Sequence, residues 1–447
     1  MKEERINYIN DKPINKEGSF VLYKMQASVR INHNLALEAA ICKANELDLP
    51  LKIIFRIDTS FPEANYRHFV FMIQGIKDIQ DKLINLGASF EIITNKEDNL
   101  FLNFINNAAS IIMDKNYLRI QKEWKNWIEE NANCEIIEIE DNIIVPVSST
   151  SYKAEWAART IRPKIMSKID YFTDDSISLT ALKHKAQVNI EQINRNNKIL
   201  KHTLKKLKEN NYLSEVEFKG GETYAKNILK EFIDSKLTNY DINHNDPSLK
   251  GSSLLSPYIH FGQISPITIV QELKHNPKAE KFIEQLVVRR ELAINYTYFT
   301  PDYDKYSSIP LWAKNTLEKH KNDNRSILYN LEKLEQASTL DKSWNASMIE
   351  MVETGYMENT MRMYWGKKII EWSPTPEEAY SRMVYLNNKY FLDGRDPNSY
   401  AGIGWCFGLH DRPWKERSIF GMVRYMNEAG LQRKYKIEDY ISKYSKP

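Results

Sequence analysis

The stretch WNASMIEMVETGYMENTMRMYWGKKIIEWSPTPEEAYSRMVYLNNKYFLDGRDPNSYAGIGWCFGLHDRPW, residues 344–414, contains five of the nine tryptophans of this 447-residue chain. Trp365 and Trp372 are seven residues apart, about two helical turns, so they share one face of a helix. Aromatic residues at helical spacing usually pack a core. This segment also carries Arg362 and Asp393, and buried polar groups need partners. The combination favours a functional site over a purely apolar core.

The first 150 residues alternate short β-rich runs with amphipathic helical patterns. Apolar runs separated by helices predict a parallel sheet with right-handed crossovers, a doubly wound (Rossmann-like) α/β domain. The first strand leads into QASVRINHNLAL without a GxGxxG or GxxxxGK[ST] motif, so we expect no glycine-loop nucleotide site there. The expected strands cover 19–25, 51–57, 89–95, 109–114 and 134–141, and the expected helices cover 34–47, 66–87, 97–108 and 117–132.

From about residue 213 the strand-like alternation disappears and helical patterns dominate. The residues before it are polar and rich in Asn, Lys and Gln, which is typical of a linker or a solvated surface excursion. We therefore expect an α/β domain at 1–145, a linker at 146–212 and an all-helical domain at 213–447. The helical patterns cover 221–236, 264–275, 279–297, 327–336, 344–372, 376–391 and 414–430.

Composition sets broad limits on the protein. The net charge of +3 is mildly basic, which neither requires nor excludes a nucleic-acid partner. Cys42, Cys134 and Cys406 are scattered, which favours reduced, buried thiols over a metal site or a disulfide. The N-terminus is polar and no apolar run approaches 18 residues. We expect a cytoplasmic protein without a membrane span.

The segment GSSLLSPYIHFGQIS, residues 251–265, is rich in hydroxyl groups. Ser252, Ser253 and Ser256 could donate hydrogen bonds to a phosphate, and helix N-termini favour anions. A serine-rich turn is more often only a turn, so this segment alone leaves both interpretations open.

The motifs LSPYIHFGQIS, VVRREL, WNASMIEM, MRMYWGKKIIEW, YLNNKY, LDGRDPN and HDRPWKERSIFGMVRYMN resemble those of the photolyase/cryptochrome superfamily, and within it the class II cyclobutane pyrimidine dimer photolyases. The N-terminal SFVLYKMQASVRINHNLALEAA is similar to the family's opening strand and helix, so the resemblance covers nearly the whole chain. It implies an antenna-type α/β domain and a helical domain that holds FAD in a folded conformation. The implied activity is light-driven repair of DNA by a monomer, with a possible antenna chromophore of the 8-hydroxy-5-deazaflavin type.

The resemblance also assigns roles to residues around the flavin. Arg362 and Asp393 correspond to the ion pair beside the isoalloxazine ring, and Asn387 to the asparagine near flavin N5. The other implied flavin contacts are Tyr240, Ser252, Ser253, Leu254, Leu255, Ser256, Asp396 and Asn398.

Three tryptophans correspond to an electron relay between the flavin and the surface. By resemblance, Trp365 is nearest the flavin, Trp344 is the middle relay and Trp372 is the exposed end. Trp405 and Met363 resemble residues that contact the lesion, the indole by stacking and the thioether by packing.

The implied partner is duplex DNA containing pyrimidine dimers. Such DNA would be bound mainly through its phosphates, with the dimer flipped out of the stack into a pocket. Trp414, in contrast, is expected to have only a packing role. The basic candidates for DNA contact are Arg289, Arg412, Lys415, Arg417 and Arg424.

The chain departs from the family pattern at two positions. The family form FLEELVVRREL is here FIEQLVVRREL, which places Gln285 where the active-site glutamate is expected. Glu284 lies about 100° around an α-helix from that position and should not replace it. Leu254 stands where the family has asparagine. Two functions remain open: a DNA-repair enzyme, or a photolyase-like blue-light flavoprotein in which repair is weak or lost.

Overall fold

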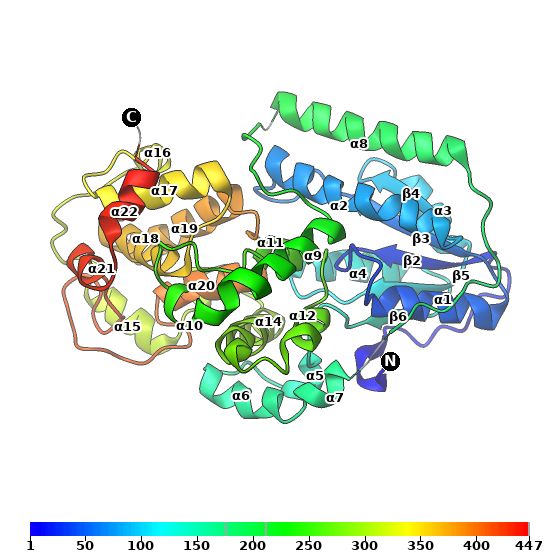
Figure 1. Ribbon diagram of the computed structural model, residues 1–447, viewed down its shortest axis with the longest axis horizontal. Coiled ribbons are helices and arrows are strands. Elements are labelled where there is room, and N and C mark those ends of the chain that lie inside the picture. The colour runs from blue at the N-terminus through cyan, green and yellow to red at the C-terminus, as the bar shows by residue number, and fades with distance from the viewer. Residues whose placement is uncertain (175–176, 211, 446–447) are drawn as a thin grey trace. The chain divides into compact units, whose positions relative to one another are not determined.

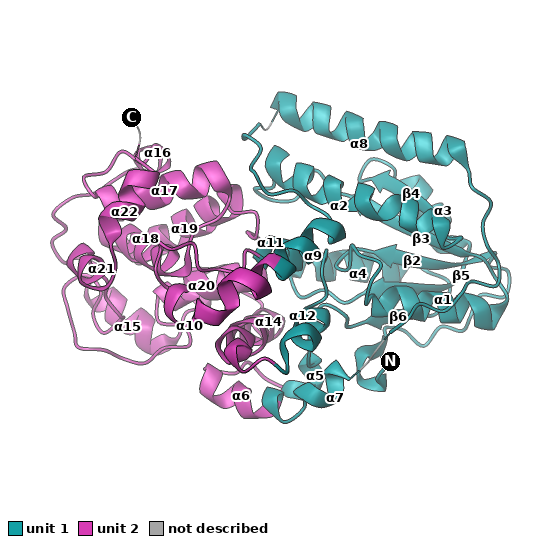
Figure 2. Cartoon of the chain, in the orientation of Figure 1, with its two compact units in different colours: residues 1–150, 165–230, 255–275 teal, residues 151–164, 231–254, 276–447 magenta. Residues whose placement is uncertain are grey.

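A computed structural model describes residues 1–174, 177–210 and 212–445. The chain forms two compact units, each built from separated stretches of sequence (Figure 2). The first unit comprises residues 1–150, 165–230 and 255–275, and the second comprises 151–164, 231–254 and 276–447. The expected division at 145 and 213 rested on composition and periodicity alone, which do not reveal such a discontinuous arrangement.

The first unit contains a six-stranded sheet of order β1-β6-β5-β2-β3-β4 (Figure 1). All neighbouring strands are parallel except β1, which runs antiparallel to β6. This confirms the predicted doubly wound α/β fold. The sequence prediction missed β1, a three-residue edge strand too short to show alternation. The strands are β1 Ile6–Tyr8, β2 Phe20–Met25, β3 Leu51–Ile57, β4 Ser89–Thr94, β5 Ala108–Asp114 and β6 Ile136–Ile139.

Four helices connect the parallel strands. Right-handed crossovers place α1 and α2 on one face of the sheet and α3 and α4 on the other. The buried β2 and β5 strands pack with α3 and α4 in a core that includes Leu22, Phe101, Ile111 and Ile128. These helices are α1 Leu35–Leu47, α2 Tyr66–Asn85, α3 Asp98–Asn106 and α4 Arg119–Asn131.

The polar stretch expected to be a linker instead contains a long helix, α8 (Ile190–Asn210), which packs beside α2 and β4 (Figure 1). The buried Asn196 accepts a hydrogen bond from Ile92 N at 3.0 Å and donates one to Phe90 O at 2.9 Å. These bonds satisfy backbone groups of the edge strand β4, which would otherwise be open to pairing with another chain. Its buried residues are Asn196, Leu200, Thr203 and Leu207, and this mixed face lies within a sequence rich in Asn, Lys and Gln, so the helical pattern is weak.

The second unit is helical, as predicted. The expected helix at 344–372 is two helices, because Gly355 ends the first of them with φ 69°. The helices of this unit are α10 Tyr240–Asn243, α13 Glu280–Ile283, α14 Arg290–Phe299, α15 Leu311–Lys319, α16 Leu331–Glu335, α17 Lys342–Thr354, α18 Asn359–Trp372, α19 Pro376–Tyr390, α20 Pro397–Cys406, α21 Glu428–Lys434 and α22 Ile437–Lys443.

Several shorter elements complete the chain. The first unit also holds α5 Val147–Thr150, α7 Ile169–Thr173, α11 Ser256–His260 and α12 Pro266–Leu273, whereas α6 Ala158–Met166 and α9 Glu222–Glu231 each belong to both units. The remaining turns are the 3-10 helices η1 Glu3–Arg5, η3 Leu237–Asn239, η4 Pro277–Ala279 and η6 Tyr306–Ser308, and the π-helices η2 Phe232–Lys236 and η5 Glu284–Arg289.

The predicted helix at 414–430 is wrong. Residues 414–427 are not helical, and the chain turns back on itself where Arg417 N donates to Gly421 O at 2.9 Å. Ile419 and Gly421 both have positive φ values, which an α-helix does not accommodate. None of the helices in the described ranges is long and apolar enough to cross a membrane.

Candidate functional site

The three tryptophans with an expected relay role lie together in the second unit. The Asp341 carboxylate caps α17 by accepting from Trp344 N at 2.9 Å, which fixes the start of this helix. Trp344 Nε1 donates to Trp365 O at 3.0 Å, and the Trp344 ring lies 5.4 Å from the Trp372 ring in an edge-to-face arrangement. Trp344 therefore contacts both of the other two residues.

The expectation that Trp372 forms an exposed end is wrong. Its side chain is only 4% exposed, because Tyr329 packs edge-to-face against it at 5.1 Å and Lys368 Nζ lies 4.7 Å from its ring. The resemblance alone implied exposure of Trp372, but this end of α18 is covered where another segment packs over it. The contact with Tyr329 has no local signal in the sequence, since the two residues are 43 positions apart.

Arg362, on the same helix as Trp365, forms an ion pair with Asp393, which follows α19. Arg362 Nη2 is 3.0 Å from both carboxylate oxygens of Asp393, and its Nε donates to Met357 O at 3.0 Å. The guanidinium also stacks 3.9 Å over the Phe391 ring, which lies 6.5 Å from the Trp365 ring. Arg362 and Asp393, 31 positions apart in sequence, are thus brought together as expected.

The Trp365 indole Nε1 is buried without a hydrogen-bond partner among the described residues. Buried donors are rarely left unpaired, so this one is a candidate to face a bound group. Asn387 is buried on α19 and donates from Nδ2 to Asn388 Oδ1 at 3.1 Å. The amide oxygen of Asn387 accepts no hydrogen bond from the described residues and is available to a ligand.

The Asp396 and Asn398 side chains bond to each other. Asp396 is the N-cap of α20, where its carboxylate accepts from Asn398 N at 2.9 Å and from Asn398 Nδ2 at 3.2 Å. The local geometry therefore gives both residues a capping role at the start of the helix that carries Trp405.

The serine turn is divided between the units: Ser252, Ser253 and Leu254 belong to the second, and Leu255 and Ser256 belong to the first. Leu255 and Ser256 lie at the start of α11. Leu254 has φ 59°, a left-handed conformation that asparagine adopts more easily than leucine. The sequence substitution noted at this position therefore falls where the backbone conformation is least suited to leucine.

Ser252 Oγ donates a hydrogen bond to the Glu358 carboxylate, which Tyr356 Oη approaches at 3.4 Å. Burial raises the pKa of Glu358 and also raises the pKa of Glu350 to about 7. Sequence reasoning missed both carboxyl groups, because each is an ordinary helix residue in the one-dimensional pattern. Tyr240 is buried between Phe232 and Phe282, and burial, with the Glu358 charge, raises its pKa.

Gln285 lies in η5, a π-helix of residues Glu284–Arg289 inserted between α13 and α14. Such insertions are rare and are often found at functional sites. Glu284 forms two hydrogen bonds to Arg162, at 3.0 and 2.6 Å, and lies 3.4 Å from Arg289 Nε. The half-buried Gln285 side chain has no hydrogen bond to any residue that the structure describes, so its amide is available to a ligand.

Trp405 and Met363 are both half-buried, on α20 and α18. Two cations flank the Trp405 ring: Lys367 Nζ lies 5.4 Å from its centroid and the Arg424 guanidinium 5.0 Å. Burial lowers the pKa of Lys367 to about 8, and its Nζ donates to Cys406 O at 2.6 Å.

Trp414, expected to have only a packing role, packs against arginines at the surface and not in an apolar core. Its side chain is 40% exposed, and it stacks with Arg424 at 4.2 Å and Arg412 at 5.6 Å. Asp411 fixes Arg424 through Nε at 2.9 Å, so this cation is held between Trp405 and Trp414. The exposed Lys415 and Arg417 follow in the same non-helical segment. The misplaced helix at 414–430 hid this arrangement from sequence reasoning.

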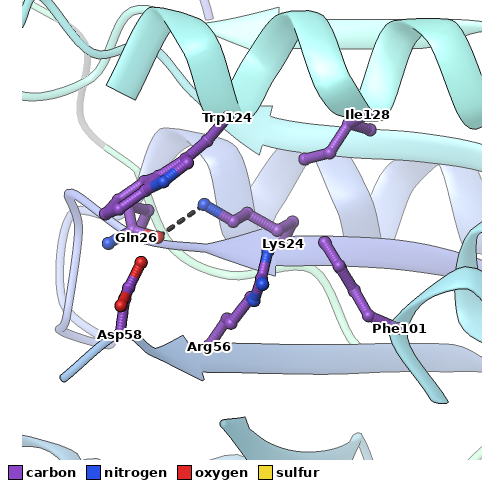
Figure 3. A pocket seen from close by; sticks show the side chains of 7 residues that line it. All are labelled: Lys24, Gln26, Arg56, Asp58, Phe101, Trp124 and Ile128. Carbon is purple, nitrogen blue, oxygen red and sulfur yellow. Dashed lines mark hydrogen bonds between the residues drawn. The ribbon is translucent and has the colours of Figure 1, made fainter. Parts of the chain in front are cut away.

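The first unit contains a small pocket at the carboxyl ends of β2 and β3 (Figure 3). Lys24 and Arg56 contribute cations, and Lys24 Nζ lies 5.6 Å from the Trp124 ring and 2.5 Å from Gln26 Oε1. Burial lowers the pKa of Lys24 to about 8. The remaining lining residues are Asp58, Phe101 and Ile128.

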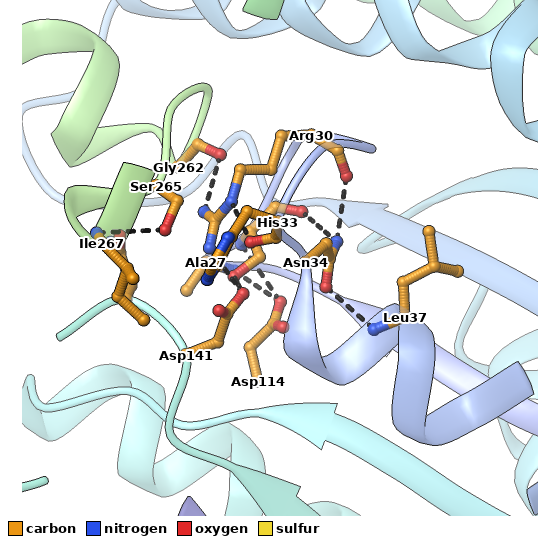
Figure 4. Close-up of polar contacts among 12 residues, drawn as sticks. Ala27, Arg30, His33, Asn34, Leu37, Asp114, Asp141, Gly262, Ser265 and Ile267 are labelled. Carbon is orange, nitrogen blue, oxygen red and sulfur yellow. Dashed lines mark hydrogen bonds and ion pairs between the residues drawn. The ribbon is translucent and has the colours of Figure 1, made fainter. Parts of the chain in front are cut away.

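A second polar cluster occupies the carboxyl ends of β2 and β5, where the strand order reverses (Figure 4). Doubly wound sheets usually bind their ligands in this crevice. Here Asp114 accepts hydrogen bonds from the backbone N–H groups of residues 26–28 at 2.6, 2.8 and 3.2 Å. Asp141 is 2.5 Å from Arg30 Nη2, and Arg30 Nη1 donates to Gly262 O at 3.1 Å. The chain itself supplies partners for Asp114, Arg30 and one oxygen of Asp141, whereas Asp141 Oδ1 is buried without a hydrogen-bond partner among the described residues.

Comparisons with known proteins agree with this architecture. The DNA photolyase family model matches residues 21–175. A deoxyribodipyrimidine photo-lyase of Methanothermobacter thermautotrophicus is 40% identical over 440 residues, which is 98% of each chain. A deoxyribodipyrimidine photo-lyase of Arabidopsis thaliana is 35% identical over 96% of this chain and 90% of its own.

Solved structures show the same fold at lower sequence identity. An archaeal photolyase of Sulfolobus tokodaii, described with two FAD molecules, has a TM-score of 0.69 at 17% identity, covering 95% of this chain and 90% of its own. A Synechocystis cryptochrome has a TM-score of 0.68 at 15% identity, with 95% and 88% coverage.

Proposed function

Because this chain belongs to the DNA photolyase family, we propose that it repairs cyclobutane pyrimidine dimers in DNA by light-driven electron transfer from bound, reduced FAD. The supporting observation is the ion pair between Asp393 and Arg362, a residue of the helix that carries Trp365, in a chain with full-length similarity to named photo-lyases. The substrate is the dimer in duplex DNA, and we propose that the protein acts as a cytoplasmic monomer.

The residues of the second unit fit a flavin. They offer a hydrogen-bond donor in the unpaired Trp365 Nε1 and an acceptor in the free amide oxygen of Asn387. They also offer an ion pair between Arg362 and Asp393. When bound and reduced, FAD supplies the electron that opens the cyclobutane ring and recovers it afterwards. Arg362 and Asp393 hold the polar face of this site, and Asn387 sets the hydrogen bond offered to the ring system.

Trp365, Trp344 and Trp372 then provide the route by which the flavin is reduced. Trp344 donates to the Trp365 backbone carbonyl, and its ring lies 5.4 Å from the Trp372 ring, so the hop between Trp344 and Trp372 is short. Trp372 is buried against Tyr329, which is itself only 5% exposed, so neither ring forms an exposed end of the route.

Trp405 and Met363 are assigned to the flipped dimer, which is cheaper to extrude than intact bases because it pairs poorly. The half-buried Trp405 ring offers a stacking surface, and Arg424 and Lys367 hold it in position. Gln285 offers the dimer an amide donor and acceptor but cannot pass a proton. The backbone phosphates are assigned to Arg289, Arg412, Lys415 and Arg417.

A blue-light flavoprotein with weak or lost repair is the second candidate. It is favoured by one observation: Glu284 is already committed to Arg162 and Arg289 and does not compensate for Gln285. Both candidates require flavin binding and photoreduction, so those properties do not separate them.

For the antenna we propose that a chromophore of the 8-hydroxy-5-deazaflavin type binds at the Lys24–Trp124 pocket. Trp124 and Phe101 provide aromatic surfaces for a planar ring, and Lys24 and Arg56 provide cations for its acidic oxygen. A Trp124→Ala variant is expected to lose the antenna absorption band and keep the flavin band. Retention of both bands would place the antenna elsewhere.

The decisive experiment illuminates purified, reduced protein bound to an oligonucleotide with one thymine dimer. We expect blue light, and not darkness, to restore intact thymines, as measured by chromatography of the products. Photoreduction of the flavin without any dimer loss would reject the repair enzyme and leave the photoreceptor. Absence of a flavin spectrum after loading would reject both.

A further inference from the structure

Two large aromatic side chains are exposed in the segment Ser151–Lys164 of the second unit. Tyr152 is 90% exposed and Trp156 is 54% exposed, and the Arg159 guanidinium lies 5.2 Å over the Trp156 ring. Aromatic residues gain most from burial, so two exposed ones four positions apart, one of them under a stacked cation, are typical of a binding surface. No role assigned above uses these residues.

The exposed charge of this segment is positive. Lys153 and Arg159 make no ion pair with a carboxylate anywhere in the part of the chain that the structure describes. The acidic residue between them, Glu155, is turned inward, where Lys164 Nζ at 2.5 Å and Ser151 Oγ at 2.7 Å bond to it. Burial opposes ionisation of Glu155, but the hydrogen bonds from Lys164, Thr160 and Ser151 prevail and lower its pKa to about 2. Glu155 is thus a structural anion that leaves two free cations beside exposed aromatic rings.

The segment is fixed to the helical run that carries Gln285. At one end Arg162 binds Glu284, the neighbour of Gln285. At the other end the buried Asn295 accepts from Glu155 N at 2.7 Å and donates to Lys153 O at 3.1 Å. Gln285 and Asn295 are ten residues apart, which corresponds to about 15 Å along a helix. The segment is therefore held on a rigid support, with its Lys153 end at Asn295, about 15 Å along the helix from Gln285, and its Arg162 end beside Gln285.

We propose that Tyr152, Lys153, Trp156 and Arg159 form a second DNA contact, which binds the strand flanking the lesion about four to five base pairs from the flipped dimer. Lys153 and Arg159 bind two successive phosphates, and the Trp156 and Tyr152 rings pack against the deoxyribose between them. The partner is DNA because the patch offers unpaired cations with apolar rings, which match a backbone of alternating phosphates and sugars. This inference rests on the proposed function, since it takes Gln285 as part of the lesion site.

The test measures equilibrium binding of the full chain to duplexes with one thymine dimer, as a function of salt. One duplex extends ten base pairs on both sides of the dimer, and two others are shortened to three base pairs on one side or the other. The double variant Lys153→Gln/Arg159→Gln is expected to bind the long duplex about tenfold more weakly at moderate salt, with the slope of log K against log salt reduced by about 1.8. One of the two shortened duplexes lacks the phosphates of the second contact. On that duplex the double variant and the unmodified protein are expected to bind with equal affinity.

Matched controls separate this effect from net charge. Lys333→Gln/Arg433→Gln removes the same charge from exposed positions of the second unit and is expected to leave affinity within about twofold of the unmodified protein. Trp156→Ala keeps the charge, so it weakens binding to the long duplex with no change in salt slope. Thermal unfolding shows whether each variant remains folded; the five substituted side chains are exposed, and no loss is expected.

The outcomes distinguish this inference from the proposed function. If the unmodified protein neither prefers dimer-containing DNA nor repairs it, the proposed function fails. If it does both, and Lys153→Gln/Arg159→Gln matches the unmodified protein on the long duplex, the second contact is rejected while the repair function stands. An equal loss on all three duplexes also rejects it, because the contact would then lie within three base pairs of the dimer.

Discussion

The indole Nε1 of Trp344 donates a 3.0 Å hydrogen bond to the backbone carbonyl of Trp365. This bond joins α17 to α18 and orients the Trp344 ring, whose other neighbour is Trp372 at 5.4 Å. An indole held in this way is a fixed intermediate between two others, which a relay requires if hops are to remain short.

Replacing Trp344 by phenylalanine should slow flavin photoreduction by at least tenfold, because phenylalanine is far harder to oxidise than tryptophan and leaves a gap in the relay. The variant also loses buried volume and the bond to Trp365, which should destabilise the fold by about 2–3 kcal/mol. Absorbance under blue light with a reductant measures the rate. Trp414→Phe, at a surface tryptophan outside the relay, serves as control, and an equal rate in Trp344→Phe and Trp414→Phe would contradict the relay.

Gln285→Glu should increase the repair yield per absorbed photon several-fold, because a carboxyl group can supply a proton and a stronger hydrogen bond to the dimer. The matched change Glu284→Gln should leave the repair yield unchanged but weaken the contacts to Arg162 and Arg289 by about 1–2 kcal/mol. Single-turnover repair and denaturant unfolding measure the two effects. A larger repair effect at position 284 would show that Glu284 is the residue facing the dimer.

Asp393→Asn should loosen the flavin site. It removes the charge partner of Arg362, whose guanidinium is largely buried against Phe391, so the protein should lose about 2–3 kcal/mol of unfolding free energy. Flavin affinity, measured by fluorescence of released flavin on dilution, should fall at least tenfold. Glu335→Gln breaks an ion pair of similar exposure with Lys389 and should leave flavin affinity unchanged.

The pH dependence of stability should contain a contribution from Glu350. Burial, against a 2.6 Å hydrogen bond from Tyr440 Oη, raises its pKa from 4.5 to about 7 in the folded state. The unfolded chain then releases this proton near pH 4.5 while the folded protein retains it, so the contribution is fully present below pH 4.5 and is lost as the pH rises to about 7. The expected loss is about 2–3 kcal/mol. Glu358, Tyr444 and Arg362 are the other groups that influence it.

Glu350→Gln removes this titration and keeps an acceptor for Tyr440. Urea unfolding of both proteins at pH 5 and pH 8 gives the comparison, because all other carboxyl groups contribute equally to each. The difference in stability between the two pH values should be about 2–3 kcal/mol smaller for the variant. Identical pH profiles would mean that Glu350 titrates normally in the folded protein.

Leu254→Asn should stabilise the protein by about 1 kcal/mol, because asparagine tolerates the positive φ of this position better than leucine does. The exposed Leu249, whose φ is not positive, is the control for the same chemical change, and Leu249→Asn should have an effect within about 0.5 kcal/mol of zero. Thermal unfolding of the apoprotein measures both. A destabilised Leu254→Asn variant would show that packing of the leucine side chain outweighs the conformational strain.

The predictable part of this protein is local. Strand β3 was placed at residues 51–57 from its apolar run alone, because flanking turn residues mark the ends of a buried strand. Helix α8 was not recognised, because Asn196 is buried for its hydrogen bonds to β4 and not for apolar packing. A hydrophobic pattern carries no trace of that kind of contact.

The residues of the site could be predicted only where they belong to a recognisable sequence motif. Arg362 and Asp393 meet as the resemblance implied, since their spacing belongs to a long motif. The bond between Ser252 and Glu358 joins residues 106 positions apart and has no local signal. Burial of Trp372 depends on Tyr329, a residue of a different segment, and so required the folded structure.

The π-helix at Glu284–Arg289 affects how this sequence is aligned with those of related proteins. A π-helix is an α-helix with one extra residue, so everything that follows it is rotated by about 100° relative to a chain without the insertion. Aligning such chains without a gap therefore matches residues correctly on one side of Glu284–Arg289 and incorrectly on the other. A glutamine at this helix can therefore reflect an exchange of the glutamate or its shift by one place. A comparison between lineages has to consider an insertion as well as a substitution here.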